Sequence, residues 1–106
     1  MPNTARIREL NDEFRRTLVG GRTVMTRGIA ARDDLPAIIE RVRGFDAFDE
    51  SNDPWAEHDF GAFKIGDDQV FWKVDYYDPD LSAGSEDPSD PAVTCRVLTI
   101  MLAEEY

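Results

Sequence analysis

The sequence predicts an α+β domain in which two helices pack on one face of a three- to four-stranded, mostly antiparallel sheet. Three features of the chain lead to this fold class. Two segments near the amino terminus carry apolar residues at helical spacing, two alternating apolar runs flank a short turn, and a further apolar run lies near the carboxyl terminus. A chain of 106 residues can bury one core but not two, so residues 1–106 are predicted to form a single domain.

The first helix is predicted over residues 4–19. Asn3 or Thr4 can cap its start, and the pair Gly20-Gly21 is predicted to end it. Its apolar stripe consists of Ile7, Leu10, Phe14 and Leu18, at steps of three, four and four residues. Residues 22–28 follow the helix and are rich in β-branched side chains, which predicts a short first strand.

The second helix is predicted to begin after Asp33-Asp34, which offer a cap and negative charge at the positive end of the helix dipole. Pro36 lies in its first turn, where proline is tolerated, and Gly44 marks its end. The apolar face of this helix consists of Leu35, Ile38, Ile39, Val42 and Phe45.

A β-hairpin is the clearest local feature of the sequence. Residues 59–65 and 69–77 have strand-like patterns and flank the turn Gly66-Asp67-Asp68. The predicted core face of the second strand consists of Val70, Trp72, Val74 and Tyr76. Residues 81–91 have the composition of a loop, and residues 93–102 fit a buried strand or a helix. Their β-branched side chains favour the strand, whereas the residues after them are typical of a helical end.

The charge of the chain is large and unevenly distributed. There are 22 acidic and 12 basic side chains, which gives a net charge of −10 and argues against direct binding of nucleic acid. Nine of the basic side chains lie in residues 1–43, whereas the segments 46–59 and 75–90 each carry six acidic side chains and no basic one. Because these segments enter and leave an antiparallel hairpin, both are predicted at the end of the hairpin opposite its turn.

Three interpretations of this acidic end are open: a solvated surface, a docking surface for a basic protein, and a divalent-cation site. The docking interpretation includes aromatic side chains among the acids. Its predicted partner-binding residues are Asp46, Asp49, Glu50, Asp53, Trp55, Glu57, Asp75, Tyr77, Asp78 and Asp80. The candidate cation ligands are Asp49, Asp53, Glu57, His58 and Asp59. A calcium loop starting at Asp49 fails, because Pro54 replaces its glycine and Phe60 replaces its bidentate glutamate.

Catalytic and cofactor motifs are sparse. His58 is the only histidine, and no serine lies in a nucleophile-elbow pattern, so we assign no catalytic residues and no cofactor apart from the cation alternative. His58 is interpreted as a loop anchor that bonds to a carboxylate or a backbone carbonyl. Cys95 is the only cysteine, the amino terminus has charges where a signal peptide is apolar, and the run 97–103 is too short to span a bilayer. These features predict a cytoplasmic protein with no membrane partner.

The segments 45–61, 71–78 and 96–106, together with Leu10–Asp12 and Thr26–Gly28, resemble a bacterial family of small acidic proteins of unknown function. Members of that family are often found on plasmids and other mobile elements of alphaproteobacteria. The resemblance implies no activity and no catalytic residues. It implies genomic surroundings in which small acidic proteins often inhibit host defence, as anti-CRISPR proteins and DNA mimics do.

The function predicted from the sequence is therefore non-enzymatic: an acidic interaction protein that binds a basic protein surface and inhibits a nucleic-acid-handling host protein, as an anti-CRISPR protein or DNA mimic does. The alternative is a small metal-dependent enzyme, or a cation-binding domain, that uses His58 and nearby carboxylates. The sequence leaves the oligomeric state open.

Overall fold

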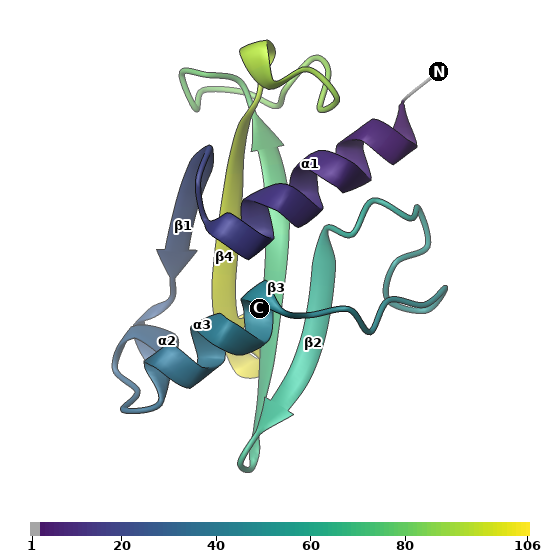
Figure 1. The fold of residues 1–106 in the computed structure, drawn as a ribbon. Helices are drawn as coiled ribbons and strands as arrows, with labels where there is room; N and C mark the ends of the chain where they lie inside the picture. Colours follow the sequence, from purple (N-terminus) through teal and green to yellow (C-terminus); the bar gives the residue numbers. More distant parts are fainter. Residues whose placement is uncertain (1–2) are drawn as a thin grey trace.

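A four-stranded sheet with the strand order β1-β4-β3-β2 forms the centre of the fold (Figure 1). The computed structural model describes residues 3–106. The strands are β1 (Gly21–Met25), β2 (Phe60–Ile65), β3 (Asp68–Tyr77) and β4 (Cys95–Leu102). β1 runs parallel to β4, and the other two neighbouring pairs are antiparallel. The α+β class and the mostly antiparallel sheet are therefore confirmed, and residues 93–102 contain the strand that their β-branched side chains favoured.

Two helices, α1 (Thr4–Thr17) and α3 (Leu35–Arg43), lie on the same face of the sheet (Figure 1). A one-turn helix, α2 (Arg27–Ala30), connects β1 to α3, and short 3₁₀ turns, η1 (Pro91–Val93) and η2 (Ala103–Glu105), flank β4. Along residues 3–106, none of the helices is both long and apolar enough to cross a bilayer.

The first strand is shorter than predicted. It was expected over residues 22–28, but the chain leaves the sheet at Thr26, whose backbone N–H donates to the Ile100 carbonyl at 3.1 Å. The carbonyl of Thr26 then accepts from the N–H groups of Ile29 and Ala30, which starts α2. Side-chain composition cannot locate this exit, because it depends on a partner in β4.

The first helix also ends earlier than predicted. Leu18 adopts a left-handed conformation with φ of 59° and its N–H donates to the Phe14 carbonyl, so α1 stops before Gly20-Gly21. Gly21 has a different role, because a Cβ there would lie 2.6 Å from the Arg96 carbonyl oxygen and 2.8 Å from the Phe14 ring. This glycine lets α1 and β4 approach β1 closely.

The hydrophobic core lies between the helices and the facing side of the sheet. Val70 and Trp72 of β3 are fully buried, as the alternation of the hairpin predicts, and Val74 is nearly so. The other fully buried apolar residues are Ile29, Ile38, Val42, Leu98 and Ile100. Tyr76, predicted on the same face, is only half-buried, because its hydroxyl belongs to a polar network with Asn11 and Glu57.

The opposite face of the sheet is not covered by any α-helix of residues 3–106 (Figure 1). By strand register, the outward side chains on the two central strands include Phe71, Lys73, Asp75, Val97, Thr99 and Met101. The carboxyl terminus folds toward this face, where the Tyr106 ring meets the Phe71 ring edge-on at a centroid distance of 5.8 Å.

Candidate functional site

Two acidic loops leave the hairpin at the end opposite its turn, as the antiparallel pairing predicts. We call residues 46–59 the first acidic loop and residues 78–90 the second acidic loop. The first loop runs into β2, and its last carbonyl, that of Asp59, accepts from the Val74 N–H at 2.8 Å. The second loop begins directly after β3. In Figure 1 the second loop covers the upper end of the sheet, and the first extends beside α1.

The second acidic loop is ordered by its own backbone and carboxylates. The Asp78 N–H donates to the Ala83 carbonyl at 2.8 Å, which continues β3 into a small hairpin. Asp78 accepts hydrogen bonds from the backbone and hydroxyl of Ser82, and Asp87 accepts from the hydroxyl and backbone of Ser89. These bonds lower the pKa of both carboxyl groups below the usual value, so both are ionised and hold their turns.

The first acidic loop has a similar turn at its exposed tip. Asp49 accepts hydrogen bonds from the hydroxyl and backbone N–H of Ser51 and from the N–H of Asn52. These bonds lower the pKa of Asp49. Because its oxygen lone pairs serve the loop itself, Asp49 is a turn-forming residue as well as an exposed charge.

His58 fastens the first acidic loop to α1. Its Nδ1 lies 2.8 Å from Oδ1 of Asp12, and its Nε2 lies 3.6 Å from Oδ2 of Asp53. The imidazole stacks on the Phe48 ring with centroids 3.7 Å apart. The backbone of His58 has φ of 56°, and its N–H donates to Oδ1 of Asp53. The histidine is therefore enclosed by two carboxylates and an aromatic ring, in the anchoring role that the sequence suggested.

A buried arginine continues this arrangement into the core. Arg15 of α1 is 1% exposed and pairs with Asp12 at 3.1 Å. Its other nitrogens donate to the carbonyls of Val42 and Phe45, where the chain leaves α3 toward the first acidic loop. Burial lowers the pKa of this guanidinium. The contact with Asp12 acts in the opposite direction but does not cancel the effect of burial. Arg15 thereby ties α1 to α3 and to the start of the loop.

A second polar network joins the two loops. Asn11 of α1 donates to the Glu57 carbonyl at 3.0 Å and to the Tyr76 hydroxyl at 2.8 Å, and the Tyr76 hydroxyl donates to the Glu57 carboxylate at 2.7 Å. Buried Arg96 of β4 donates to Oδ1 of Asn11 and to the Pro88 carbonyl. Burial and the Glu57 contact raise the pKa of Tyr76, so its hydroxyl remains a donor at neutral pH.

Asp59 shows that the acidic side chains at this end of the sheet repel one another. Burial and the neighbouring charge of Glu57 raise the pKa of Asp59 above its usual value. Like charges at this end of the sheet are thus close enough to disfavour each other, although the loops stay in place.

Across residues 3–106, no lysine or arginine lies within salt-bridge distance of a carboxylate of either acidic loop. Several arginines pair with carboxylates outside the loops: Arg6 with Glu9, Arg43 with Glu40, and Arg32 with Asp34 and Asp68. Arg8 and Arg96 reach the loops but bond to the backbone carbonyls of Ala56 and Pro88. The negative charge of the loops is therefore held in position without being neutralised.

Comparison with known proteins shows the family of this chain. Residues 23–105 match a family described as proteins of unknown function, DUF3768. The chain belongs to the DUF3768 family. No curated protein and no solved structure shows significant similarity to it. The matched DUF3768 region includes both acidic loops, His58 and Arg96, whereas Asn11, Asp12 and Arg15 precede it. The side chains that fasten the loops to α1 thus come from outside the matched region.

The predicted partner-binding residues separate into three groups in this DUF3768 chain. Asp46, Asp49, Glu50, Trp55, Tyr77 and Asp80 are exposed, and Asp78 is half-exposed within its turn. Asp53 is 8% exposed and faces His58, and Glu57 is half-buried against Tyr76. Asp75 lies on the outward face of β3, where it pairs with Lys73. The accessible surface therefore consists of the first group, which includes Trp55 at 75% exposure.

The candidate cation ligands are not gathered into one site. Within residues 3–106, no three histidine, cysteine or acidic side chains are arranged to hold a metal ion. Asp49 serves its own turn, Asp53 faces His58, and Glu57 bonds to Tyr76. Both ring nitrogens of His58 face carboxylates, so the ring offers no outward lone pair.

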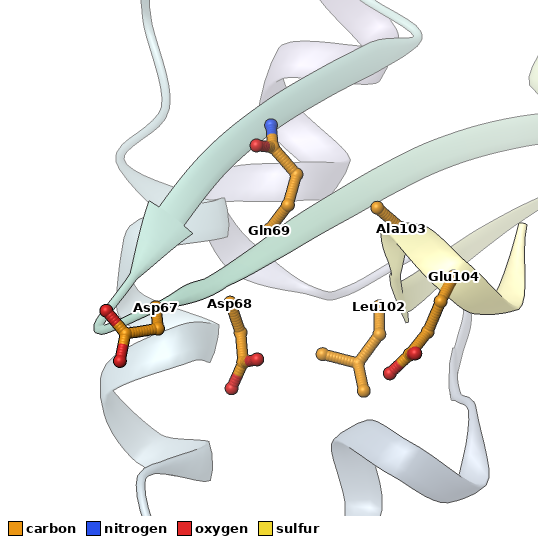
Figure 2. Close-up of a pocket in the computed structure, with 6 residues that line it drawn as sticks. All are labelled: Asp67, Asp68, Gln69, Leu102, Ala103 and Glu104. Atoms are coloured by element: carbon orange, nitrogen blue, oxygen red, sulfur yellow. The ribbon is translucent and has the colours of Figure 1, made fainter.

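A shallow hollow of about 230 Å³ lies at the other end of the hairpin, between its turn and η2 (Figure 2). It is lined by Asp67, Asp68, Gln69, Leu102, Ala103 and Glu104. Figure 2 shows the carboxylates of Asp68 and Glu104 on either side of Leu102. Asp68 pairs with Arg32, and the lining offers no nucleophile or histidine, so this hollow supplies no catalytic constellation.

The anchoring role of His58 leads to a local prediction. His58→Asn removes the ring but keeps a residue that tolerates the left-handed backbone. We expect faster backbone hydrogen exchange across the first acidic loop and a loss of about 1–2 kcal/mol in the free energy of unfolding, because the bond to Asp12 and the stacking on Phe48 disappear. Hydrogen exchange followed by mass spectrometry measures the first effect. Trp55→Ala, in the same loop but exposed, is the control, and equal exchange in both variants would contradict the anchor.

Proposed function

We propose that this chain is a non-enzymatic interaction protein whose two acidic loops bind a basic surface of another protein. One observation carries the proposal: the loop carboxylates have no lysine or arginine partner across residues 3–106, yet hydrogen bonds and anchors hold them in fixed positions. Unpaired, ordered charges steer an oppositely charged partner and lose little entropy when it binds.

An exposed aromatic residue adds contact area to this surface. Trp55 is 75% exposed and lies in the first acidic loop, close to the anchor at His58. Tryptophan is enriched among the residues that dominate binding energy at protein interfaces. An exposed tryptophan in the same loop as exposed acidic side chains suits a partner with basic groups near an apolar pocket.

The class of partner that fits this chemistry best is a protein that handles nucleic acid. Such proteins present lysine and arginine side chains spaced for phosphates, and ordered carboxylates can occupy the same positions. The chain would then act as an inhibitor that competes with nucleic acid, as DNA mimics and some anti-CRISPR proteins do.

A matched pair of triple variants tests the proposal. The loop variant carries Glu50→Gln, Asp80→Asn and Glu86→Gln, all exposed acids of the two loops. The control variant carries Glu13→Gln, Asp33→Asn and Asp67→Asn, which are exposed acids outside the loops and have no salt bridge among the described residues. Both variants lose the same net charge, so only the location of the lost charge differs.

The measurement is fluorescence anisotropy of a labelled oligolysine peptide. We expect the loop variant to bind about tenfold more weakly than the wild type and the control variant less than about threefold more weakly, at roughly 0.5 kcal/mol per exposed charge pair. In a second arm, the wild type should release a labelled DNA duplex from the same peptide at concentrations where the loop variant does not. Equal weakening in the two triple variants would show that only the net charge matters and would refute the loops as the binding surface.

A further inference from the structure

The sheet has two edge strands, β1 and β2, and their outer edges differ. At the β2 edge, Arg41 of α3 donates to the Lys64 carbonyl at 3.3 Å, and its guanidinium lies over the Phe63 ring at 4.6 Å. β1 forms the opposite edge and pairs only with β4 among the strands of residues 3–106. No helix or strand of these residues lies along the outer side of β1 (Figure 1).

The pairing of β1 with β4 determines which backbone groups of β1 point away from the sheet. The Thr26 N–H donates to the Ile100 carbonyl. Successive residues of a strand direct their backbone groups to alternate sides, so the residues two and four positions before Thr26 also bond to β4. The N–H and carbonyl groups of Gly21, Thr23 and Met25 therefore point to the outer edge. Across residues 3–106, those of Thr23 and Met25 have no hydrogen-bond partner.

The outer edge of β1 is accessible and regular. Val24 is 47% exposed, and Thr23 and Met25 are half-exposed. The strand contains no proline, and its pairing with β4 runs without a bulge over residues 21–25. Prolines and bulges are common devices that prevent an edge strand from pairing further. An edge without them can accept an additional strand through main-chain hydrogen bonds.

The charges around β1 indicate the chemistry of the strand that would fit. Arg22 and Arg27 are the only charged side chains of residues 18–31, and β4 carries no acidic side chain. Within residues 3–106, neither arginine lies within salt-bridge distance of a carboxylate. Glu105 reaches the end of β1, but its carboxylate accepts hydrogen bonds from the Thr26 hydroxyl and from two backbone N–H groups. The two arginines are therefore available to acidic groups of a partner.

We propose that the outer edge of β1 binds an extended acidic segment of another protein, which adds a fifth strand to the sheet. Main-chain hydrogen bonds to Thr23 and Met25 hold the segment, and acidic side chains near its two ends pair with Arg22 and Arg27. A second copy of this chain fits less well, because it would bring together two β1 edges of like positive charge. The proposal is independent of the function proposed for the acidic loops, whose partner is basic.

Amide hydrogen exchange followed by nuclear magnetic resonance tests the added strand directly. The probe is a hexapeptide of alternating valine and threonine with a glutamate at each end. We expect saturating peptide to slow the exchange of the Thr23 and Met25 amides by at least about tenfold. The Val24 amide already bonds to β4 and is the internal control, so its exchange should not change. Unchanged exchange at Thr23 and Met25 would overturn the proposal.

A proline variant separates the edge from the rest of the fold. Thr23→Pro removes one outward N–H without removing a bond to β4, and should weaken peptide binding by at least about tenfold. Thr23→Val keeps the N–H and should bind as the wild type does, while circular dichroism confirms that both variants are folded. Equal binding by the two variants would refute main-chain pairing. Self-association of the wild type that Thr23→Pro abolishes would also refute the proposal, because a second copy would then occupy the edge.

A second pair of variants tests the acidic character of the partner. Arg22→Gln/Arg27→Gln should bind the peptide about fivefold more weakly, as expected for two exposed charge pairs. The control Arg16→Gln/Lys64→Gln removes the same charge at exposed side chains outside β1 and α2, and should change binding less than about twofold. A peptide with glutamine in place of both glutamates should also bind about fivefold more weakly. Equal binding of the two peptides would contradict an acidic partner.

Discussion

Replacing Arg15 with methionine is expected to lower the free energy of unfolding by about 3–5 kcal/mol, a large part of the 5–15 kcal/mol that holds a typical domain. Methionine keeps the apolar volume under the rings of Phe48 and Trp72, over which the guanidinium lies at 5.3 and 5.0 Å. It provides no donor for the carbonyls of Val42 and Phe45. A buried acceptor left without its donor costs more than the bond itself contributed.

Replacing Arg15 also affects the first acidic loop, because Asp12 bonds both to Arg15 and to His58 of that loop. Removing only one partner of a partly buried ion pair is strongly destabilising, because the charge of the other partner is left uncompensated. Urea unfolding monitored by circular dichroism measures the effect. Arg16→Met is the control, since Arg16 is its exposed neighbour on the same helix. Equal midpoints for the two variants would show that Arg15 does not join α1 to α3.

Arg15 also shows what the sequence pattern could and could not predict. The apolar stripe of α1 was defined by its hydrophobic members, yet Asn11 and Arg15 lie on the same helical face, four and eight residues after Ile7, and both are buried. Arg96 likewise alternates in phase with the buried residues Leu98 and Ile100. Polar residues in phase with a buried stripe were therefore a usable signal for buried networks. Their partners were not predictable, because Arg96 and Asn11 are 85 residues apart.

The hairpin and its charge were predictable for a different reason. Strand alternation and a short turn are local features, and antiparallel pairing then fixes which ends of the two strands meet. The placement of both acidic loops at one end of the sheet follows from that pairing alone. The inward orientation of Asp53 and Glu57 does not, because it depends on the left-handed backbone at His58 and on contacts with α1.

The roles of the glycines were not predictable from the sequence either. The sequence does not distinguish a glycine that ends a helix from a glycine whose missing side chain makes room for a core residue. Gly44 ends α3 with φ of −91°, and a Cβ there would lie 3.4 Å from the Glu40 carbonyl, an ordinary contact. Gly61 on β2 lies beneath the indole of Trp72, and a Cβ there would lie 2.3 Å from its Nε1 atom. The buried Nε1 has no hydrogen-bond partner among residues 3–106, so the ring is held there by packing and by the Arg15 guanidinium that lies over it.

Gly61→Ala should therefore destabilise the fold by about 2–3 kcal/mol, the usual cost of forcing an extra carbon into a packed core. For a domain of this length, the expected fall in Tm is about 10–20 °C by circular dichroism. Gly44→Ala, which adds the same atom, should change Tm little or raise it, because alanine reduces the entropy of the unfolded chain. The double variant Gly61→Ala/Trp72→Phe should lose less stability than the sum of its single variants, because the smaller ring makes room for the methyl group. Additive losses would mean that the indole can shift away from β2, and that Gly61 is not what positions Trp72 in the core.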